Sequence, residues 1–338
     1  MPDVLVTGGT GFLGGALVRA LAACGQRVRV LVRPTSDQGR LDGLPVEPVV
    51  GDVTRPETLA PAVDGVHTVY HLAGMLGRFG VPEAAYHALH VDGTCNLLRA
   101  CAGGHLKRFV YSSSPGMLGQ VAPGGPPRDE TAPHRPTSIY ERSKSAAEKA
   151  ALPLAAALGV PLVIARPEFV YGPGDEHVLG LFRSIQRGTF FYIGSGNSLC
   201  HPSYIDDVVA GLLACAGKRV RPLEAYHICG PRPVTIRELA TAVAAALEVK
   251  APSLHLPKWL VSAGAWAAER AASVLHIDPP FTLEGVRFFT ESRAFSIARA
   301  WNELGWRPEV GIEEGARRSV AWYREQGWLP PGRNAQGT

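Results

Sequence analysis

Little in this sequence points to a secreted, metal-binding or nucleic-acid-binding protein. The 338 residues contain six cysteines, and no two of them form a C-x-x-C pair. This excludes a dense disulfide framework and the common zinc motifs, so we expect reduced thiols and no metal site in a cytoplasmic protein. Charged residues make up 19% of the chain, the net charge is +4 and no long basic run occurs. Nucleic acid is therefore a poor candidate partner.

The sequence also lacks the features of a secretory leader or a membrane span. A strand-like Val4-Leu5-Val6 run begins after three residues, without the basic and apolar regions of a signal peptide. The longest apolar stretch with membrane character, residues 259–268, is about half of the roughly 20 residues that a span requires. We expect no transmembrane segment and, at most, contact with a membrane surface.

Short β-branched runs alternate with helical patterns in the first half of the chain. The runs are nearly continuous in apolar character, as in strands buried on both faces; they cover residues 4–7, 28–32, 46–50, 66–71, 107–112 and 161–166. Helices are expected at residues 12–24, 83–102 and 138–158. This alternation predicts an α/β fold of the Rossmann type, a doubly wound parallel sheet with right-handed crossovers.

The second half has a different texture. Glycine and aromatic residues are frequent in 167–196, short helices are expected at 205–216 and 236–246, and all six tryptophans lie after residue 258. We expect a dinucleotide-binding domain over 1–166, to which part of 200–235 returns. A smaller C-terminal substrate-binding lobe over 167–329 and a flexible tail over 330–338 complete the predicted organisation.

A glycine-rich turn follows the first expected strand and opens the first expected helix. Gly8 allows the tight turn, Gly11 lets the backbone approach a pyrophosphate, and Gly14 lets the helix pack closely on the strand. The free N–H groups and the positive end of the helix dipole then bind phosphates. The candidate cofactor-binding residues here are Gly8, Thr10, Gly11, Phe12, Leu13 and Gly14.

The end of the second strand bears on which dinucleotide binds. An NAD site usually has Asp or Glu there, whereas this sequence continues with Arg33, Pro34, Thr35 and Ser36. Arg33 can pair with a 2′-phosphate, assisted by the hydroxyls of Thr35 and Ser36. This favours NADP(H) and leaves NAD(H) open; a solvated surface arginine is the alternative interpretation.

Two more strand ends supply candidate cofactor contacts. Asp52 and Val53 follow the third strand, where a short acid can accept a hydrogen bond from the adenine amino group, although an Asx turn explains it almost as well. The fourth strand ends in His71, which is as readily a packed histidine as a functional one. The residues after it are small enough to leave room for the cofactor ribose: Leu72, Ala73 and Gly74.

Tyr140 and Lys144 lie four residues apart at the start of a long expected helix, so they share one face. A free tyrosine has a pKa of about 10, and we expect a nearby ammonium and the cationic nicotinamide ring to lower it. Three serines, 112–114, end the fifth strand at the sheet edge where ligands bind. Although a Tyr-x-x-x-Lys pair alone often occurs by chance, the combination predicts that Tyr140 exchanges a proton with a serine-held substrate oxygen.

In these motifs the chain resembles the extended short-chain dehydrogenase/reductases, the superfamily of nucleotide-sugar epimerases, dehydratases and 3β-hydroxysteroid dehydrogenases. The resemblance extends over nearly the whole chain, through residues 166–174, 204–208 and 304–308. It implies that Ser114 is the catalytic hydroxyl, Tyr140 the acid/base and Lys144 its partner. It further implies cofactor contacts at Ser112, Pro167 and Val170, and a homodimer paired through helices of the first domain.

The chain departs from this family's pattern at two places. The family's Asn-Val-x-Gly-Thr segment here begins with His90, which either substitutes as a hydrogen-bonding group or is a packed helix histidine. Nucleotide-sugar epimerases carry an Arg before an aromatic-x-x-x-Asp segment, and residues 199–204 contain none. A diphosphate would lose a bidentate partner, for which Arg183, Arg187 or Arg232 can compensate.

Residues 254–289 are markedly apolar, and their order resembles the 3β-hydroxysteroid dehydrogenase branch, including Pro279-Pro280 before a helix. An apolar cleft suits a sterol, terpenoid or β-keto acyl substrate with a secondary alcohol or ketone, and hence an NAD(P)-dependent oxidoreductase. Ordinary core, or a dimer or membrane-surface contact, explains the same residues about as well. The other functions considered are a nucleotide-sugar or hopanoid-associated sugar epimerase/dehydratase and a non-catalytic NADP-binding regulatory protein.

Overall fold

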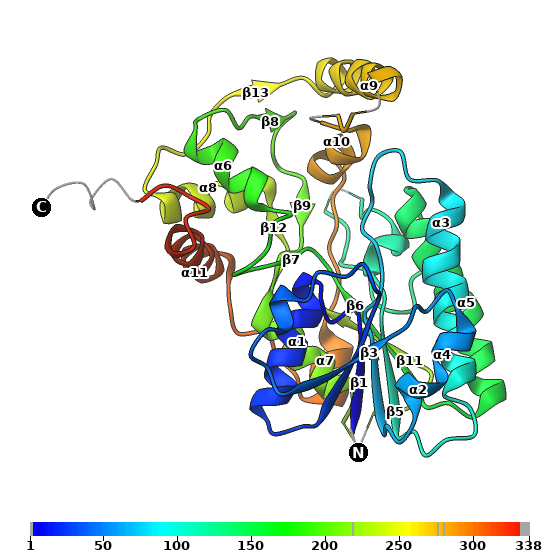
Figure 1. Ribbon diagram of the computed structural model, residues 1–338. Coiled ribbons are helices and arrows are strands. Elements are labelled where there is room, and N and C mark those ends of the chain that lie inside the picture. The colour runs from blue at the N-terminus through cyan, green and yellow to red at the C-terminus, as the bar shows by residue number, and fades with distance from the viewer. Residues whose placement is uncertain (1–2, 123, 218–219, 276, 280, 332–338) are drawn as a thin grey trace, which may run out of the picture.

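A seven-stranded, wholly parallel sheet forms the centre of the larger part of the molecule (Figure 1). The computed structural model describes residues 3–122, 124–217, 220–275, 277–279 and 281–331. The strand order is β11-β6-β5-β4-β1-β2-β3, and the chain changes direction across the sheet between β1 and β4. Parallel α/β sheets bind ligands at such a point. The strands are β1 (Val4–Thr7), β2 (Val28–Val32), β3 (Val46–Val50), β4 (Thr68–His71), β5 (Arg108–Ser112), β6 (Leu162–Pro167) and β11 (Glu224–Ile228).

Helices cover both faces of this sheet. One face packs against α1 (Phe12–Ala23) and α7 (Ile205–Cys215), which also contact each other. The other packs against α2 (Ala60–Val63), α4 (Gly93–Ala100) and α5 (Ile139–Leu158). A π-helical turn joins α3 (Glu83–His87) to α4. The α/β class and the doubly wound parallel sheet are confirmed.

The six strands predicted from apolar runs all form, with ends shifted by at most two residues. Five are largely buried, but β3 is not: Glu47 and Pro48 face solvent and Val50 is 64% exposed. The prediction of burial on both faces is therefore wrong for β3. It is the edge strand beyond β2, so only one neighbour covers it.

The remaining elements build the C-terminal lobe, drawn in the upper part of Figure 1. Three two-stranded pairs lie outside the seven-stranded sheet: β7 (Val170–Tyr171) with β10 (Ser203–Tyr204), β9 (Leu199–Cys200) with β12 (Val234–Thr235), and β8 (Tyr192–Ile193) with β13 (His255–Leu256). The helices of the lobe are α6 (Leu179–Gln186), α8 (Ile236–Leu247), α9 (Lys258–Leu275), α10 (Leu283–Thr290) and α11 (Ile312–Glu325). Pro280 and most of the tail predicted to be flexible, residues 332–338, lie outside the described residues.

The start of α5 is fixed by a capping box. The Ser138 hydroxyl accepts a hydrogen bond from the Glu141 N–H at 3.2 Å, and the Glu141 carboxylate accepts one from the Ser138 N–H at 3.3 Å. This arrangement satisfies two of the donors that a helix start leaves unpaired. Because Tyr140 lies between these two residues, the cap also fixes the turn that carries the candidate acid/base.

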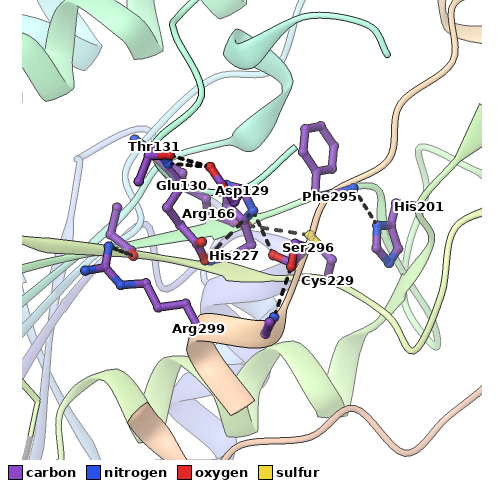
Figure 2. A network of polar contacts seen from close by, with 12 residues as sticks. Asp129, Glu130, Thr131, Arg166, His201, His227, Cys229, Phe295, Ser296 and Arg299 are labelled. Carbon is purple, nitrogen blue, oxygen red and sulfur yellow. Dashed lines mark hydrogen bonds and ion pairs between the residues drawn. The ribbon is translucent and has the colours of Figure 1, made fainter. Parts of the chain in front are cut away.

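A buried polar network holds the end of β6 (Figure 2). The Arg166 guanidinium donates to both Glu148 oxygens at 2.9 and 2.6 Å and to the Glu130 carbonyl at 3.3 Å. On β11, the His227 N–H donates to the Glu130 carboxylate, and its ring Nδ1 to the Ser296 carbonyl. Burial lowers the pKa of His227 to about 3, so this ring stays neutral. The network thus ties β6, next to Pro167, to three segments that lie far apart in the sequence: the loop at Glu130, α5 at Glu148 and β11 at His227.

Three further findings concern membrane spans, cysteines and metal sites in the described chain. Its helices include none long and apolar enough to cross a bilayer. All six cysteines are free thiols, and only Cys24 is exposed. Within the described ranges, no three or more His, Cys, Asp or Glu side chains are grouped so as to hold a metal ion.

Candidate functional site

The turn between β1 and α1 has a shape that only glycine permits. Gly8 has a φ of +73°, and a Cβ placed on it would lie 2.7 Å from the backbone of Leu72 and Ala73. A Cβ on Gly14 would overlap the Gly8 carbonyl. Gly11, with extended backbone, precedes the first turn of α1 and makes no side-chain cap. No side chain therefore caps the first N–H groups of α1, an arrangement that fits the phosphates of a dinucleotide.

The other residues predicted at this turn have mixed surroundings. Thr10 is half-buried within the turn. Phe12 and Leu13 start α1 and are partly buried against the core of the C-terminal lobe. They therefore join the phosphate end of the helix to the lobe as well as lying beside the candidate cofactor site.

Arg33 is exposed just beyond the end of β2. Its backbone N–H donates to the Ser36 hydroxyl at 3.2 Å, and the Ser36 N–H donates to the Arg33 carbonyl at 3.0 Å. The serine thus closes the turn after β2. The exposed Arg33 thus directly follows the strand at whose end the adenosine ribose binds in folds of this type.

Asp52 forms the Asx turn that was the alternative interpretation. Its carboxylate accepts hydrogen bonds from the N–H and the hydroxyl of Thr54, both at 2.8 Å. Val53 is buried against Gly93, and its carbonyl accepts a hydrogen bond from Asn96 at 3.1 Å. Both residues therefore make contacts within the chain that stabilise the loop after β3.

A chain of buried hydrogen bonds, absent from our sequence analysis, joins the ends of β1 and β4. The Ala73 N–H donates to the Thr7 hydroxyl, which lies 2.7 Å from Nδ1 of His71; Nε2 of that ring is 3.0 Å from the Thr94 hydroxyl. Thr94 in turn donates to the His90 carbonyl at 2.6 Å. Burial lowers the pKa of His71 to about 3. His71 is thus a neutral, packed histidine that hydrogen-bonds at the start of the predicted cofactor loop, residues 72–74.

His90 continues this chain to the helix of Tyr140. Its Nε2 accepts the Met75 N–H at 3.0 Å, so the ring proton lies on Nδ1, 2.8 Å from the Ser143 hydroxyl. Ser143 donates to the Tyr140 carbonyl at 2.7 Å. Burial lowers the pKa of His90 to about 2. The histidine is both packed and hydrogen-bonded at the family's asparagine position.

Ser114, Tyr140 and Lys144 meet at the carboxyl edge of β5. The Lys144 ammonium donates to the Ser112 carbonyl at 2.8 Å and lies 5.0 Å from the centre of the Tyr111 ring. Burial lowers the pKa of Lys144 to about 8. Ser114 accepts the Gly116 N–H at 3.2 Å, and its hydroxyl is near enough to the phenol of Tyr140 to act against a rise in the pKa of that phenol. A Cβ on Gly74 would lie 3.6 Å from Nζ of Lys144, so the predicted cofactor loop borders the same group.

The chain's own groups around Tyr140 act against the lowered pKa that we expect from an ammonium together with the nicotinamide ring; that expectation stays a prediction. Burial, the largest influence, raises its pKa, and the carboxylate of Glu168 raises it further; the nearby hydroxyl of Ser114 opposes them. The phenol is therefore neutral across the physiological range. Helix spacing correctly placed Lys144 one turn away, but it carries no information on how deeply the phenol is buried.

A cluster around Glu168 was missed from the sequence. Glu168 follows Pro167 at the end of β6 and precedes Phe169, whose φ of 38° is unusual for a bulky residue. Burial raises the pKa of Glu168 to about 7 although Arg293 opposes the rise. Arg293 pairs with Glu141 at 2.6 Å. Glu168 lies between Pro167 and Val170, two residues that the resemblance implies as cofactor contacts, whereas nothing in the sequence connects Arg293 to it.

A cavity of about 260 Å³ opens beside Tyr140. Its lining includes two arginines, Arg78 and Arg287, and the carboxylate of Glu284. Arg142 also lines the cavity and pairs with Glu83 at 3.0 Å. The rest of the lining is Gly77, Tyr86, Thr137, Ser138, Ile139 and Tyr140. This lining is more charged than the apolar cleft expected from residues 254–289.

The apolar residues expected to line the cleft lie elsewhere. Val261, Phe281 and Phe289 pack in a small core between α9, α10 and β8, and Phe288 packs on Phe169. The lobe contributes to the cavity from α10 through Glu284 and Arg287 instead. Other apolar residues of the segment face solvent: Leu254, Trp259, Leu260, Trp266, Val274, Leu275 and Ile277.

Two of the three arginines considered as diphosphate partners are engaged elsewhere. Arg183 donates to the Trp328 carbonyl at 3.1 Å, and Arg232 pairs with Glu238 at 2.9 Å. Arg187 follows the end of α6. None of the three belongs to the lining of the cavity beside Tyr140.

Comparisons with known proteins agree with this arrangement. The model of the NAD dependent epimerase/dehydratase family matches residues 4–229. The chain is 32% identical to the 2-alkyl-3-oxoalkanoate reductase of Stenotrophomonas maltophilia, covering 94% of this chain and 98% of that one. It is 29% identical to the 3-beta-hydroxysteroid dehydrogenase of Mycolicibacterium neoaurum, covering 95% and 91%.

Among solved structures, the chain is similar to gox2253, with a TM-score of 0.81 and 31% identity. The match covers 97% of this chain and 100% of the gox2253 chain. The family match extends over more than half of the chain and includes the glycine turn, Ser114, Tyr140 and Lys144. The chain therefore belongs to the NAD dependent epimerase/dehydratase family and is an enzyme of the extended short-chain dehydrogenase/reductase type.

Proposed function

We propose that this enzyme is an NAD(P)-dependent oxidoreductase acting on a secondary alcohol or ketone of a hydrophobic substrate, of the β-oxo acyl or 3β-hydroxysteroid type. The observation that carries this proposal is the meeting of Ser114, Tyr140 and Lys144 at one sheet edge, beside the cavity. The activities for which two relatives are named support the substrate class, and the chain matches both over nearly its full length.

The proposed division of labour follows from the surroundings of each group. When bound, the nicotinamide dinucleotide supplies or accepts the hydride. Ser114 holds the substrate oxygen by a hydrogen bond, and Tyr140, its neighbour, gives that oxygen a proton or takes one from it. Lys144, held by the Ser112 carbonyl, supplies positive charge one helical turn away. His90 and Ser143 keep the Tyr140 turn in place.

We further propose that NADP(H) is the preferred cofactor. Arg33 directly follows β2, its guanidinium is exposed, and no carboxylate stands at the strand end where NAD sites usually place one. Separate titrations with NADPH and NADH, followed by tryptophan quenching, test this. We expect NADPH to bind at least about tenfold more tightly, and Arg33→Ala to abolish the difference. Equal affinities in the unaltered enzyme would contradict the assignment.

The function itself is tested with Tyr140→Phe. Removing the phenol oxygen should lower turnover of 2-alkyl-3-oxo acids or 3β-hydroxysteroids by about 10²- to 10⁴-fold, the usual range for a general acid/base. Cofactor affinity should change little. Turnover that survives the substitution would mean that Tyr140 is not the proton donor.

A sugar-nucleotide epimerase is the second candidate, favoured by the charged cavity lining, since Arg78 and Arg287 suit an anionic substrate. An epimerase should be purified with NAD(H) firmly bound and show no net cofactor turnover. A dehydrogenase should exchange its cofactor freely. The state of the purified enzyme therefore separates the two candidates before any substrate is known.

A further inference from the structure

Large apolar side chains gather on the solvent side of α9 and just after it. Trp259 is 72% exposed and Val274 77%. The set, called here the α9 patch, comprises Trp259, Leu260, Trp266, Val274, Leu275 and Ile277, half of the twelve large apolar residues that are exposed in the described chain. Figure 1 shows α9 at the end of the lobe farthest from the seven-stranded sheet. Monomeric soluble proteins rarely leave such a concentration uncovered.

The α9 patch is separate from the side of α9 that packs into the core. The side of α9 that packs on α10 and β8 contains Val261 and Ala265, which are buried. The exposed side contains Trp259, Trp266 and Val274, spaced seven and eight residues apart, so they lie along one line of the helix. An ordinary surface helix is polar on that side. Here both sides are apolar, and only one is covered.

The charges of α9 indicate what covers the other side. The helix has only three charged residues: Lys258, Glu269 and Arg270. Glu269 accepts a hydrogen bond from the Leu283 N–H at 2.8 Å, so its carboxylate serves the start of α10. Lys258 and Arg270 are exposed, and the Arg270 guanidinium lies 5.6 Å from the centre of the Trp266 ring. The exposed side therefore combines tryptophans, aliphatic residues and positive charge.

This combination suits the boundary between lipid and water. Tryptophan favours the headgroup level, aliphatic side chains enter the acyl region, and basic residues attract anionic lipids. A second copy of the chain suits it less well. A symmetric contact would set the same face against itself, with Lys258 and Arg270 repeated on both sides and the exposed Asp278, beside Ile277, as the carboxylate next to the patch to set against these two basic residues.

We propose that the α9 patch docks this enzyme peripherally on a bilayer that contains anionic lipid. No helix of the described chain spans a membrane, so the contact lies in the plane of the interface. Helix α10, which packs on the buried side of α9, contributes Glu284 and Arg287 to the cavity beside Tyr140. A hydrophobic substrate dissolved in the bilayer would thus be offered close to the site; this last step rests on the proposed function, whereas the docking does not.

Co-sedimentation of the full chain with phosphatidylcholine vesicles, with and without phosphatidylglycerol, tests the docking. We expect binding to the anionic vesicles, weakened at least about tenfold in Trp259→Ser/Trp266→Ser because both indoles leave the interface. Trp301→Ser is the matched control: its indole is also exposed, but it lies outside the patch. Lys258→Glu/Arg270→Glu should remove the preference for phosphatidylglycerol.

Three results would overturn the docking. They are the absence of vesicle binding by the unaltered enzyme, equal binding by the tryptophan variant, and a dimer of the unaltered enzyme that becomes monomeric in that variant. The last would make the patch a self-association surface. Turnover of a water-soluble ketone, measured on each variant, is expected to stay unchanged. If vesicles bind but no ketone or alcohol is turned over, the proposed function fails and the docking stands.

Discussion

The edge of the sheet around Tyr140 and the cap formed by α9 and α10 are built on different principles. At the sheet edge, polar side chains are buried and hydrogen-bonded in an unbroken series from Thr7 to Tyr140. In the cap, large apolar side chains are exposed and charged ones line the cavity. Burying an unpaired polar group costs far more than exposing an apolar one. The sheet edge therefore tolerates few residue types, and the cap tolerates many.

The largest effect is expected where no side chain fits. Gly14→Ala places a methyl group against the Gly8 carbonyl, so the turn must move. We expect a loss of about 3 kcal/mol in the free energy of unfolding, together with weaker dinucleotide binding. Urea unfolding and cofactor titration measure both.

Gly180→Ala is the matched control, since a Cβ there meets nothing within 4 Å and α6 gains helix propensity. It should stabilise the protein by about 0.5–1 kcal/mol. If Gly14→Ala behaves in the same way, the close approach of the turn to α1 is not what the glycine is needed for.

Glu168 tests the boundary between the two regions through pH. Burial raises its pKa from 4.5 to about 7 in the folded protein, so the folded state holds the proton more tightly than the unfolded state. Its contribution to stability is complete below pH 4.5 and is lost as the pH rises through 7, by at most roughly 3 kcal/mol. Glu168→Gln should remove that slope.

Urea unfolding at about pH 5 and about pH 8 measures the slope for both proteins. The unaltered enzyme should lose more stability over this interval than Glu168→Gln does. Parallel curves would show that the carboxylate titrates normally and that Arg293 compensates for its burial.

His90 tests whether the buried series positions Tyr140. His90→Leu leaves the Met75 N–H and the Ser143 hydroxyl without their partner, at a cost of about 1–3 kcal/mol in stability. We expect kcat to fall more than KM rises, because the turn carrying Tyr140 loosens. His90→Asn, which restores an acceptor and a donor, should recover most of kcat. If the two variants have equal kcat values, the hydrogen bonds of His90 do not position Tyr140, and its ring serves packing alone.

The same contrast explains what the sequence could predict. The parallel sheet, the glycine turn and the spacing of Tyr140 and Lys144 depend on local pattern, and the structure brings them together. β11 was not predicted as a strand, and the burial of β3 was wrong, because neighbours in the sheet decide both. Glu168 and Arg293 meet only through tertiary packing. The α9 segment is apolar on both sides, so periodicity could not tell which side would be covered.

The smallest effect is expected on the exposed side of α9, and its smallness sharpens the comparison. Trp266→Ser removes a side chain that is already more than half exposed, so the free energy of unfolding should stay within about 0.5 kcal/mol. Val261→Ser, on the covered side, should cost at least about 1.5 kcal/mol, since it removes a buried aliphatic group and buries a hydroxyl. Thermal and urea unfolding of the two variants compare them directly. A large loss in Trp266→Ser would mean that the indole supports the fold, and the two sides of α9 would then not differ in the way that the docking requires.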